Sequence, residues 1–106
     1  MLHLFHKKED SAAFRRKQAA SFDGLSVQYV TERTESGEVV LGRGGSVSVR
    51  DGELILLCAG DIVFRAPVEE ISFSELLSGN GVILTGVDTL SARERTLIAY
   101  FSYYRK

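Results

Sequence analysis

Apolar and polar residues alternate with a period of two along much of the chain, which is typical of β-strands with one buried face. The alternation is clearest in residues 46–66, where three short apolar runs are separated by Asp51-Gly52 and by Ala59-Gly60-Asp61. Asp-Gly favours the positive backbone angles of a type I′ turn. We therefore predict an antiparallel meander here, with strands at 46–50, 53–58 and 61–66.

Further strands are predicted on both sides of this meander, at about 25–29, 70–76, 82–85 and 96–104, and a brief apolar run at 39–41 precedes the glycine-rich segment. The segment 68–78 is ambiguous. Pro67 followed by Glu69 and Glu70 also suits the first turn of a helix, whereas Ile71 and Phe73 alternate as they do in a strand. We favour the strand.

Two interruptions are predicted in this pattern. The glycine-rich segment 42–45 indicates a bulge or a tight bend. The polar segment 86–95 indicates a loop, in which Ser91 and Glu94 suit the cap of one helical turn. Along 61–66, the alternation places Ile62, Phe64 and Ala66 on one face of the strand, and Val63 and Arg65 on the other.

One helix is predicted ahead of the strands, over about residues 10–21. Its first residues are good N-caps, and most of those that follow are strong helix formers. Gly24 is placed where a glycine commonly ends a helix. The apolar stripe of the helix consists of Phe14 and Phe22 with small alanines beside them, so the helix needs a sheet to pack on.

Residues 54–58 are apolar on both faces of their predicted strand. One face of such a strand packs in the core, and the other needs a second cover. Either Phe14 and Phe22 of the helix lie over Ile55 and Leu57, or another subunit does.

The last strand also has two apolar faces. Its first face carries Leu97, Ala99, Phe101 and Tyr103, and we assign it to the core. Its second face carries Ile98 together with two tyrosines. The predicted interface residues of the whole chain are therefore Ile55, Leu57, Tyr100 and Tyr104.

These elements predict a mainly β fold in one domain, since the chain has 106 residues. We expect a six- or seven-stranded antiparallel meander, at about 25–104, curled into a small bent barrel with one N-terminal helix. Residues 1–9 are predicted to form a flexible basic tail, and residues 10–106 a single globular domain.

The charge distribution changes this picture only at the ends of the chain. The net charge is −1. Residues 1–20 hold five basic and two acidic residues, and residues 93–106 hold four basic residues and one acidic residue. Acidic residues outnumber basic ones in the middle of the chain. No apolar run is long enough to span a bilayer and no secretory signal is evident, which leads us to expect a cytoplasmic protein.

Residues with catalytic or metal-binding chemistry are sparse. His3 and His6 have the spacing of two ligands on one helical turn, and a histidine at position three can also bind Cu(II) or Ni(II). Solvated tail residues explain them more simply. Cys58 falls inside an apolar strand and is expected to be an inert core thiol. We therefore predict no metal site, no cofactor and no enzymatic activity.

Two other patterns do not define a site. The glycine-rich segment 42–45 lacks the Lys-Ser/Thr ending of a phosphate-binding loop and is followed by a strand. The acidic pairs Glu69-Glu70 and Glu32/Glu35 are interpreted as solvated surface.

A glycine-rich approach to a strand, then Asp51–Leu56, a turn, Ile62-Val63-Phe64 and Pro67–Ile71, resembles the bacterial pleckstrin-homology-like (PH-like) domains over about residues 39–104. The resemblance implies a bent seven-stranded antiparallel barrel capped by a C-terminal helix. This chain ends in a strand, so the N-terminal helix would have to provide the cap. Members of that family bind lipids, peptides or each other, and no family binding residue can be placed on this sequence.

The leading functional hypothesis is a non-enzymatic binding or assembly module that acts through self-association or a protein partner. A second hypothesis is a module that uses the basic termini on an anionic surface, either lipid or nucleic acid. Membrane binding is the weaker expectation, and nucleic-acid binding is not expected from the net charge. A third is a small-ligand-binding barrel or enzyme with a pocket lined by tyrosines and acidic side chains.

Overall fold

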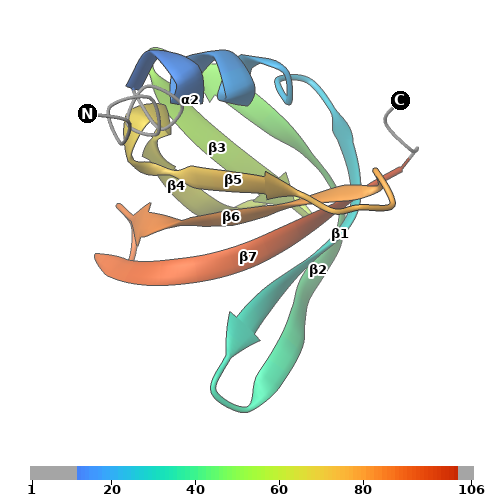
Figure 1. Cartoon of the computed structure of the whole chain (residues 1–106). Helices are drawn as coiled ribbons and strands as arrows, with labels where there is room; N and C mark the ends of the chain where they lie inside the picture. Colours follow the sequence, from blue (N-terminus) through green and yellow to red (C-terminus); the bar gives the residue numbers. More distant parts are fainter. Residues whose placement is uncertain (1–11, 103–106) are drawn as a thin grey trace.

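The computed structural model describes residues 12–102, and within them one helix and seven strands form a single antiparallel sheet (Figure 1). The strand order across the sheet is β4-β3-β2-β1-β7-β6-β5. This confirms the prediction of a mainly β fold with six or seven strands and one helix. The elements in chain order are α2 (Ala12–Ala20), β1 (Ser26–Thr34), β2 (Gly37–Arg50), β3 (Glu53–Cys58), β4 (Asp61–Pro67), the 3₁₀ turn η1 (Val68–Glu70), β5 (Ser72–Glu75), β6 (Gly81–Asp88) and β7 (Arg93–Phe101).

The sheet curls into a half-barrel whose two edge strands are β4 and β5 (Figure 1). Helix α2 packs on η1 and β5 and lies across one end of the half-barrel. Phe22, just after the helix, stacks between Phe73 and Phe101, with ring centroids 5.6 and 6.0 Å apart. The inner face of the sheet forms one apolar core that includes Val30, Val47, Leu54, Leu56, Phe64, Ile71, Leu84 and Leu97.

The turns follow the predicted chemistry in the meander. Asp51 and Gly52 have φ angles of 54° and 77°, so both central residues of the β2–β3 turn lie in the left-handed region, as a type I′ turn requires. At position 45 a glycine is needed because a side chain would collide with β3. A Cβ atom there would lie 1.8 Å from the carbonyl oxygen of Leu57, because β2 and β3 approach closely where their ladder begins.

Three local predictions are corrected by the structure. Strand β2 runs without interruption from Gly37 to Arg50, and the irregularity is a register shift at Leu41, where Val30 pairs with Gly42 and Thr31 with Val40. In the segment 68–78 the favoured strand is confirmed at Ser72–Glu75 (β5), and a single 3₁₀ turn (η1) precedes it.

The loop predicted over 86–95 is much shorter. Strand β6 continues to Asp88 and β7 begins at Arg93, so only four residues connect them and no helical turn forms. The Ser91 hydroxyl donates to the Asp88 carboxylate instead of capping a helix. The polar residues that favoured a loop in the sequence are therefore strand residues with polar partners.

The predicted faces of β4 are also partly wrong. Phe64 and Ala66 are buried as expected, but Ile62 is 40% exposed and Val63 packs against the core. The cause is a bulge in the β3–β4 ladder, where Leu56 pairs with Phe64 and Leu57 with Ile62. A bulge reverses the alternation for the residues beyond it.

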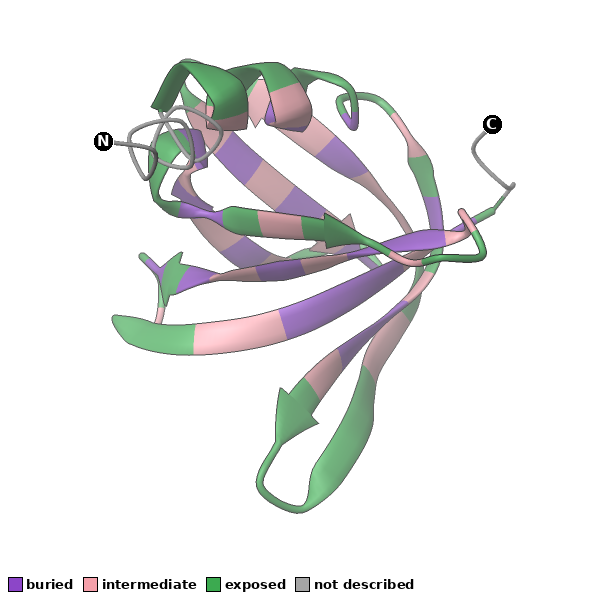
Figure 2. Cartoon of the chain, in the orientation of Figure 1, coloured by how far each residue is buried: buried purple, intermediate pink, exposed green. Residues whose placement is uncertain are grey.

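The β1–β2 hairpin extends away from the half-barrel (Figures 1 and 2). Strand β7 pairs with β1 only as far as Arg33, and β3 pairs with β2 only from Gly45 onward. The end of the hairpin is exposed, whereas β3 alternates between buried and half-buried residues (Figure 2). The tyrosine and charged side chains of this hairpin contribute to the candidate site.

Candidate functional site

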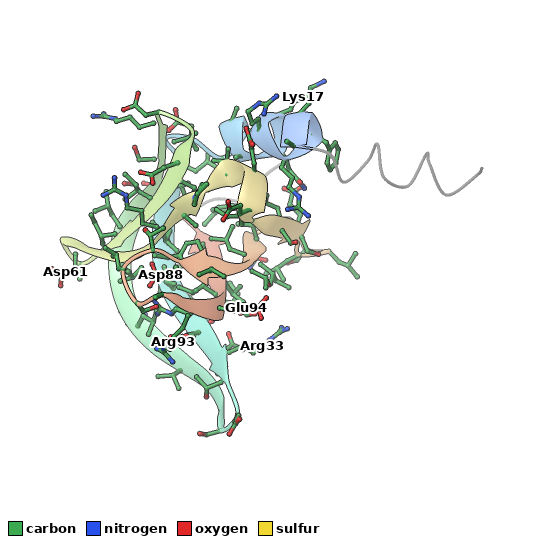
Figure 3. The ribbon with its side chains drawn as sticks, turned by 90° about the vertical axis from the view of Figure 1, so that its left-hand side faces the viewer. Lys17, Arg33, Asp61, Asp88, Arg93 and Glu94 are labelled. Carbon is green, nitrogen blue, oxygen red and sulfur yellow. The ribbon has the colours of Figure 1, made fainter. Side chains whose placement is uncertain are left out.

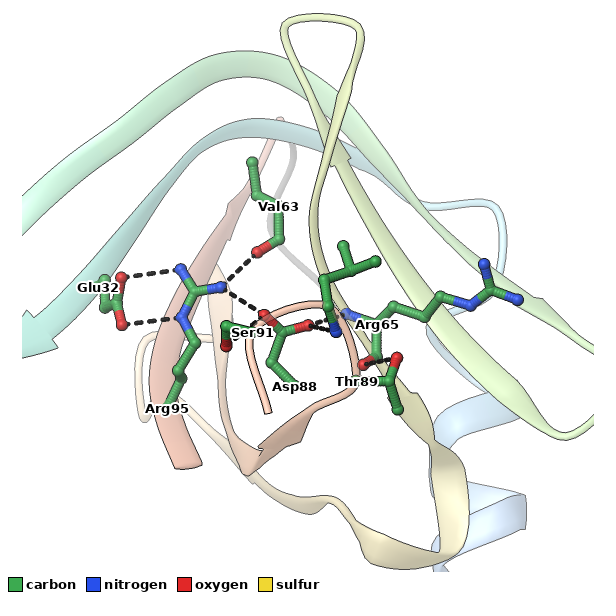
Figure 4. Close-up of polar contacts among 8 residues, drawn as sticks. Glu32, Val63, Arg65, Asp88, Thr89, Ser91 and Arg95 are labelled. Atoms are coloured by element: carbon green, nitrogen blue, oxygen red, sulfur yellow. Dashed lines mark hydrogen bonds and ion pairs between the residues drawn. The ribbon is translucent and has the colours of Figure 1, made fainter. Parts of the chain in front are cut away.

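A network of ionic groups, in which Asp88 is buried and Glu32 and Arg95 are half-buried, centres on Arg95 of β7 (Figure 4). Its guanidinium donates two hydrogen bonds to the Glu32 carboxylate, at 2.8 and 2.9 Å, and one to the Asp88 carboxylate at 2.9 Å. A further bond at 2.9 Å reaches the Val63 carbonyl oxygen of β4. Arg95 thereby joins β1, β4, β6 and β7 at one end of the half-barrel, and we call Glu32, Asp88 and Arg95 the Arg95 network.

The carboxylates of the Arg95 network are charged at neutral pH. The pKa of Glu32 is lowered chiefly by its hydrogen bonds from Arg95. Burial alone would raise the pKa of Asp88, but hydrogen bonds from Arg95, Ser91 and the backbone outweigh it, and the pKa is lowered. Asp88 is 1% exposed and so depends on these donors.

The same network closes one edge of the sheet. The Arg65 amide of β4 donates to Asp88, and the Arg65 carbonyl accepts hydrogen bonds from the amide and the hydroxyl of Thr89. Backbone groups that an edge strand normally exposes are thus bonded to side chains and a turn. Within residues 12–102, no buried side-chain nitrogen or oxygen lacks a hydrogen-bond partner. The Arg95 network therefore has a structural role, which is to attach the edge strand β4 to the rest of the fold.

An open cleft of about 760 Å³ lies beside the Arg95 network, between the β1–β2 hairpin and the start of β7. Its walls hold three arginines and three glutamates, of which Arg95 and Glu32 bond to each other. The exposed members include Arg33, Arg93 and Glu94 (Figure 3). The lining residues are Glu32, Arg33, Thr34, Glu35, Ser36, Arg93, Glu94, Arg95 and Thr96.

The predicted interface residues Ile55 and Leu57 lie on the outer face of β3, where both are half-buried. The ladder places Leu57 beside Ile62 of β4 on the same side, and Ser46 and Ser48 of β2 border them. We call Ile55, Leu57 and Ile62 the outer apolar face. Helix α2 does not lie over it, because Phe22 packs on Phe73 and Phe101 in the interior.

A tyrosine cluster occupies the outer face of β1, β2 and β7. The rings of Tyr29 and Tyr100 stack with centroids 4.5 Å apart, and the Arg43 guanidinium lies 5.6 Å from the Tyr29 ring. The Tyr100 hydroxyl donates to Glu38 at 3.0 Å, and the Thr31 hydroxyl donates to the same carboxylate oxygen. The predicted interface residue Tyr100 is half-buried in this cluster.

Hydrogen bonding sets the charge states in the tyrosine cluster. The hydroxyls of Thr31 and Tyr100 lower the pKa of Glu38, while burial and the neighbouring carboxylate raise the pKa of Tyr100. Glu38 is therefore an anion at neutral pH, and the cation of Arg33, its cross-strand partner, also lowers its pKa. Sequence alternation identified Tyr100, but the partners Tyr29, Arg43 and Glu38 were missed because the pairing of β1, β2 and β7 is not local in sequence.

The other candidate residues between positions 12 and 102 do not assemble a site. Cys58 is buried, and burial raises the pKa of its thiol, as an inert core cysteine requires. In α2, the Arg16 guanidinium pairs with the Glu69 carboxylate, so part of the basic segment attaches the helix to η1. Within residues 12–102, no group of three potential metal ligands comes together. His3, His6 and Tyr104, and the predicted tail 1–9, lie outside the described residues.

No protein-family model, curated protein or solved structure matches this chain. Over residues 12–102, no helix has both the length and the apolar character needed to cross a bilayer.

Proposed function

We propose that this domain is a non-enzymatic binding or assembly module that acts through self-association or a protein partner. The observation that carries the proposal is the outer apolar face. Its residues Ile55 and Leu57 belong to a strand that is apolar on both sides, and α2 packs on η1 and β5 rather than over them. Apolar side chains gathered on the outside of a sheet, with serines and the Glu53–Arg65 ion pair around them, are typical of a contact surface.

The fold supports placing the domain among the PH-like modules. A curled antiparallel half-barrel with a single packed helix is compatible with that class. Among the described residues the helix precedes the sheet rather than following it, so α2 would take the place of the C-terminal helix. Interaction with another protein is a common use of such modules and fits a cytoplasmic location.

A charge placed in the outer apolar face tests this proposal. We expect Leu57→Glu to weaken self-association or partner binding at least tenfold, because a buried charge at the centre of an interface costs about 2 kcal/mol or more. Val87→Glu is the matched control, since Val87 is exposed on β6. Multi-angle light scattering over a concentration series and partner capture measure the effect. A chain that stays monomeric at high concentration and captures no partner would contradict the proposal.

The cleft beside the Arg95 network supports a second candidate function, the binding of a small ligand. Its volume of about 760 Å³ is within the range of ligand sites. Its lining of arginines and glutamates differs from the predicted lining of tyrosines and acidic groups, and it suits a small zwitterion. Thermal-shift screening of zwitterions with the wild type and with Arg93→Ala tests this. The absence of any stabilisation removes the candidate.

A further inference from the structure

The outer edge of the β1–β2 hairpin is an unpaired β-strand edge. Residues 37–43 of β2 pair with β1 on one side. On the other side, the ladder with β3 begins only at Gly45, and the Ala59 amide bonds the Gly44 carbonyl. Within residues 12–102, no strand pairs with this second side of 37–43. We call it the hairpin edge.

The composition of the hairpin edge favours pairing with another strand. Val39 and Val40 are 48% and 51% exposed, and Leu41 follows them. Residues 39–42 include no charged residue and no proline, the two features that most often protect an edge. An exposed edge of this kind offers its backbone hydrogen-bonding groups to a further strand.

The other two edges of the sheet offer much less. Strand β4 is closed by the Arg95 network and by Thr89. Strand β5 is four residues long and packs against α2. The hairpin edge is therefore the longest open edge of the described sheet.

The charged residues of the hairpin edge indicate which strand could pair with it. Glu38 and Arg43 are five positions apart, so a regular strand would direct them to opposite faces. The register shift at Leu41 brings both onto the outer face, where each contacts the tyrosine cluster. Both hydrogen bonds to Glu38 reach Oε2, which leaves Oε1 accessible to a partner's guanidinium.

We propose that the hairpin edge pairs, antiparallel, with the hairpin edge of a second copy of this chain. Two-fold pairing centred on Val40 and Leu41 sets Glu38 of each copy opposite Arg43 of the other, on the same face of the joined sheet. The interface is isologous, so each ion pair forms twice. This inference rests on the proposed assembly function but uses a surface distinct from the outer apolar face.

Charge reversal provides a self-controlled test. Glu38→Arg alone places like charges opposite each other at both ends of the interface, and so does Arg43→Glu alone. We expect each variant to weaken dimerisation about tenfold, since each replaces two cross-strand ion pairs by repulsive pairs. Mixed in equal amounts, the two variants restore opposite charges in a heterodimer, and dimerisation should return to near the wild-type level.

Amide hydrogen exchange identifies the segment that pairs. We expect exchange of residues 38–42 to slow as the wild-type concentration rises, and to stay fast in Glu38→Arg at the same concentrations. Thermal melting of both variants checks that they fold. Sedimentation velocity of the variants and their mixture measures dimerisation.

The outcomes separate this inference from the proposed function. Recovery in the mixture, with slowed exchange at 38–42, supports the paired edge. Self-association that both variants retain but Leu57→Glu abolishes overturns the hairpin-edge inference and leaves the proposed function standing. A wild type that remains monomeric overturns the inference, and a lack of any captured partner then overturns the proposed function as well. Two singly altered chains that are both monomeric and do not associate on mixing would also overturn the inference.

Discussion

Two strand edges of the same sheet have opposite surroundings. The β4 edge is bonded by Arg95 of β7, Asp88 at the end of β6 and Thr89 of the β6–β7 turn. The hairpin edge of β2 has no such neighbour among residues 12–102. The backbone groups of the two edges are the same, so the difference comes from which long polar side chains the curled sheet brings within reach.

The β4 edge and the hairpin edge differ in whether their charged residues stabilise the fold or remain open to a partner. At the β4 edge Asp88 is buried and Glu32 and Arg95 are half-buried, and their hydrogen bonds fix one arrangement of β1, β4, β6 and β7. At the hairpin edge Glu38 and Arg43 are exposed, and apolar side chains lie between them. We infer that the first edge holds the fold together and that the second is left for intermolecular contact.

The largest expected effect is at the Arg95 network. Arg95→Met removes both ion pairs and leaves Asp88 and Glu32 without their cation, so we expect a loss of about 3–5 kcal/mol in the free energy of unfolding. Urea denaturation measures it. Arg93→Met, on the same strand but exposed, is the control and should change stability by less than about 0.5 kcal/mol. Equal losses in the two variants would show that the network does not stabilise the β4 edge.

The meander was predictable because its information is local. Asp51-Gly52 specifies its own turn, and the alternation in β3 specifies which side is buried. The Arg95 network was not predictable in this way. Glu32 and Arg95 are far apart in sequence, and they meet only because β1 pairs with β7 and the sheet then curls toward β4.

The errors had a similar origin. The segment 86–95 was expected to be a loop because Asp88 and Arg95 are polar, yet each is bonded inside the structure. The remaining prediction errors were caused by β-bulges. A one-residue shift near Leu57 exchanged the expected faces of Ile62 and Val63, and another at Leu41 brought Glu38 and Arg43 onto one face. A bulge depends on the partner strand, so single-strand patterns do not reveal it.

The second prediction concerns pH. Both carboxylates of the Arg95 network have lowered pKa values in the folded state. Their contribution is complete above the unfolded values, about 3.9 for Asp and 4.3 for Glu, and it is lost as the pH falls through the folded values. Over that range the unfolded chain binds more protons, so acid destabilises the fold.

Arg95→Met should reverse the sign of this effect for Asp88. Without the guanidinium, the burial of Asp88 favours its protonated form, so acidification relieves a buried charge. We expect the difference in unfolding free energy between the wild type and the variant to shrink as the pH is lowered from about 6 to 3. Urea denaturation across this range gives the difference at each pH. A difference that does not change with pH would mean that the carboxylates are not coupled to Arg95.

The smallest expected change in the free energy of unfolding is at the hairpin edge. It is measured by making the same substitution, valine to threonine, at two positions of β2. Val47 is 2% exposed and faces the core, whereas Val40 is 51% exposed. Val47→Thr buries a hydroxyl and should cost about 1–3 kcal/mol, while Val40→Thr should change the unfolding free energy by less than about 0.5 kcal/mol. Both are measured by urea denaturation at a concentration low enough to keep the chain monomeric. A loss of more than 1 kcal/mol for Val40→Thr would mean that the hairpin edge stabilises the monomer, because an exposed strand that serves only intermolecular contact contributes nothing until a second chain is bound.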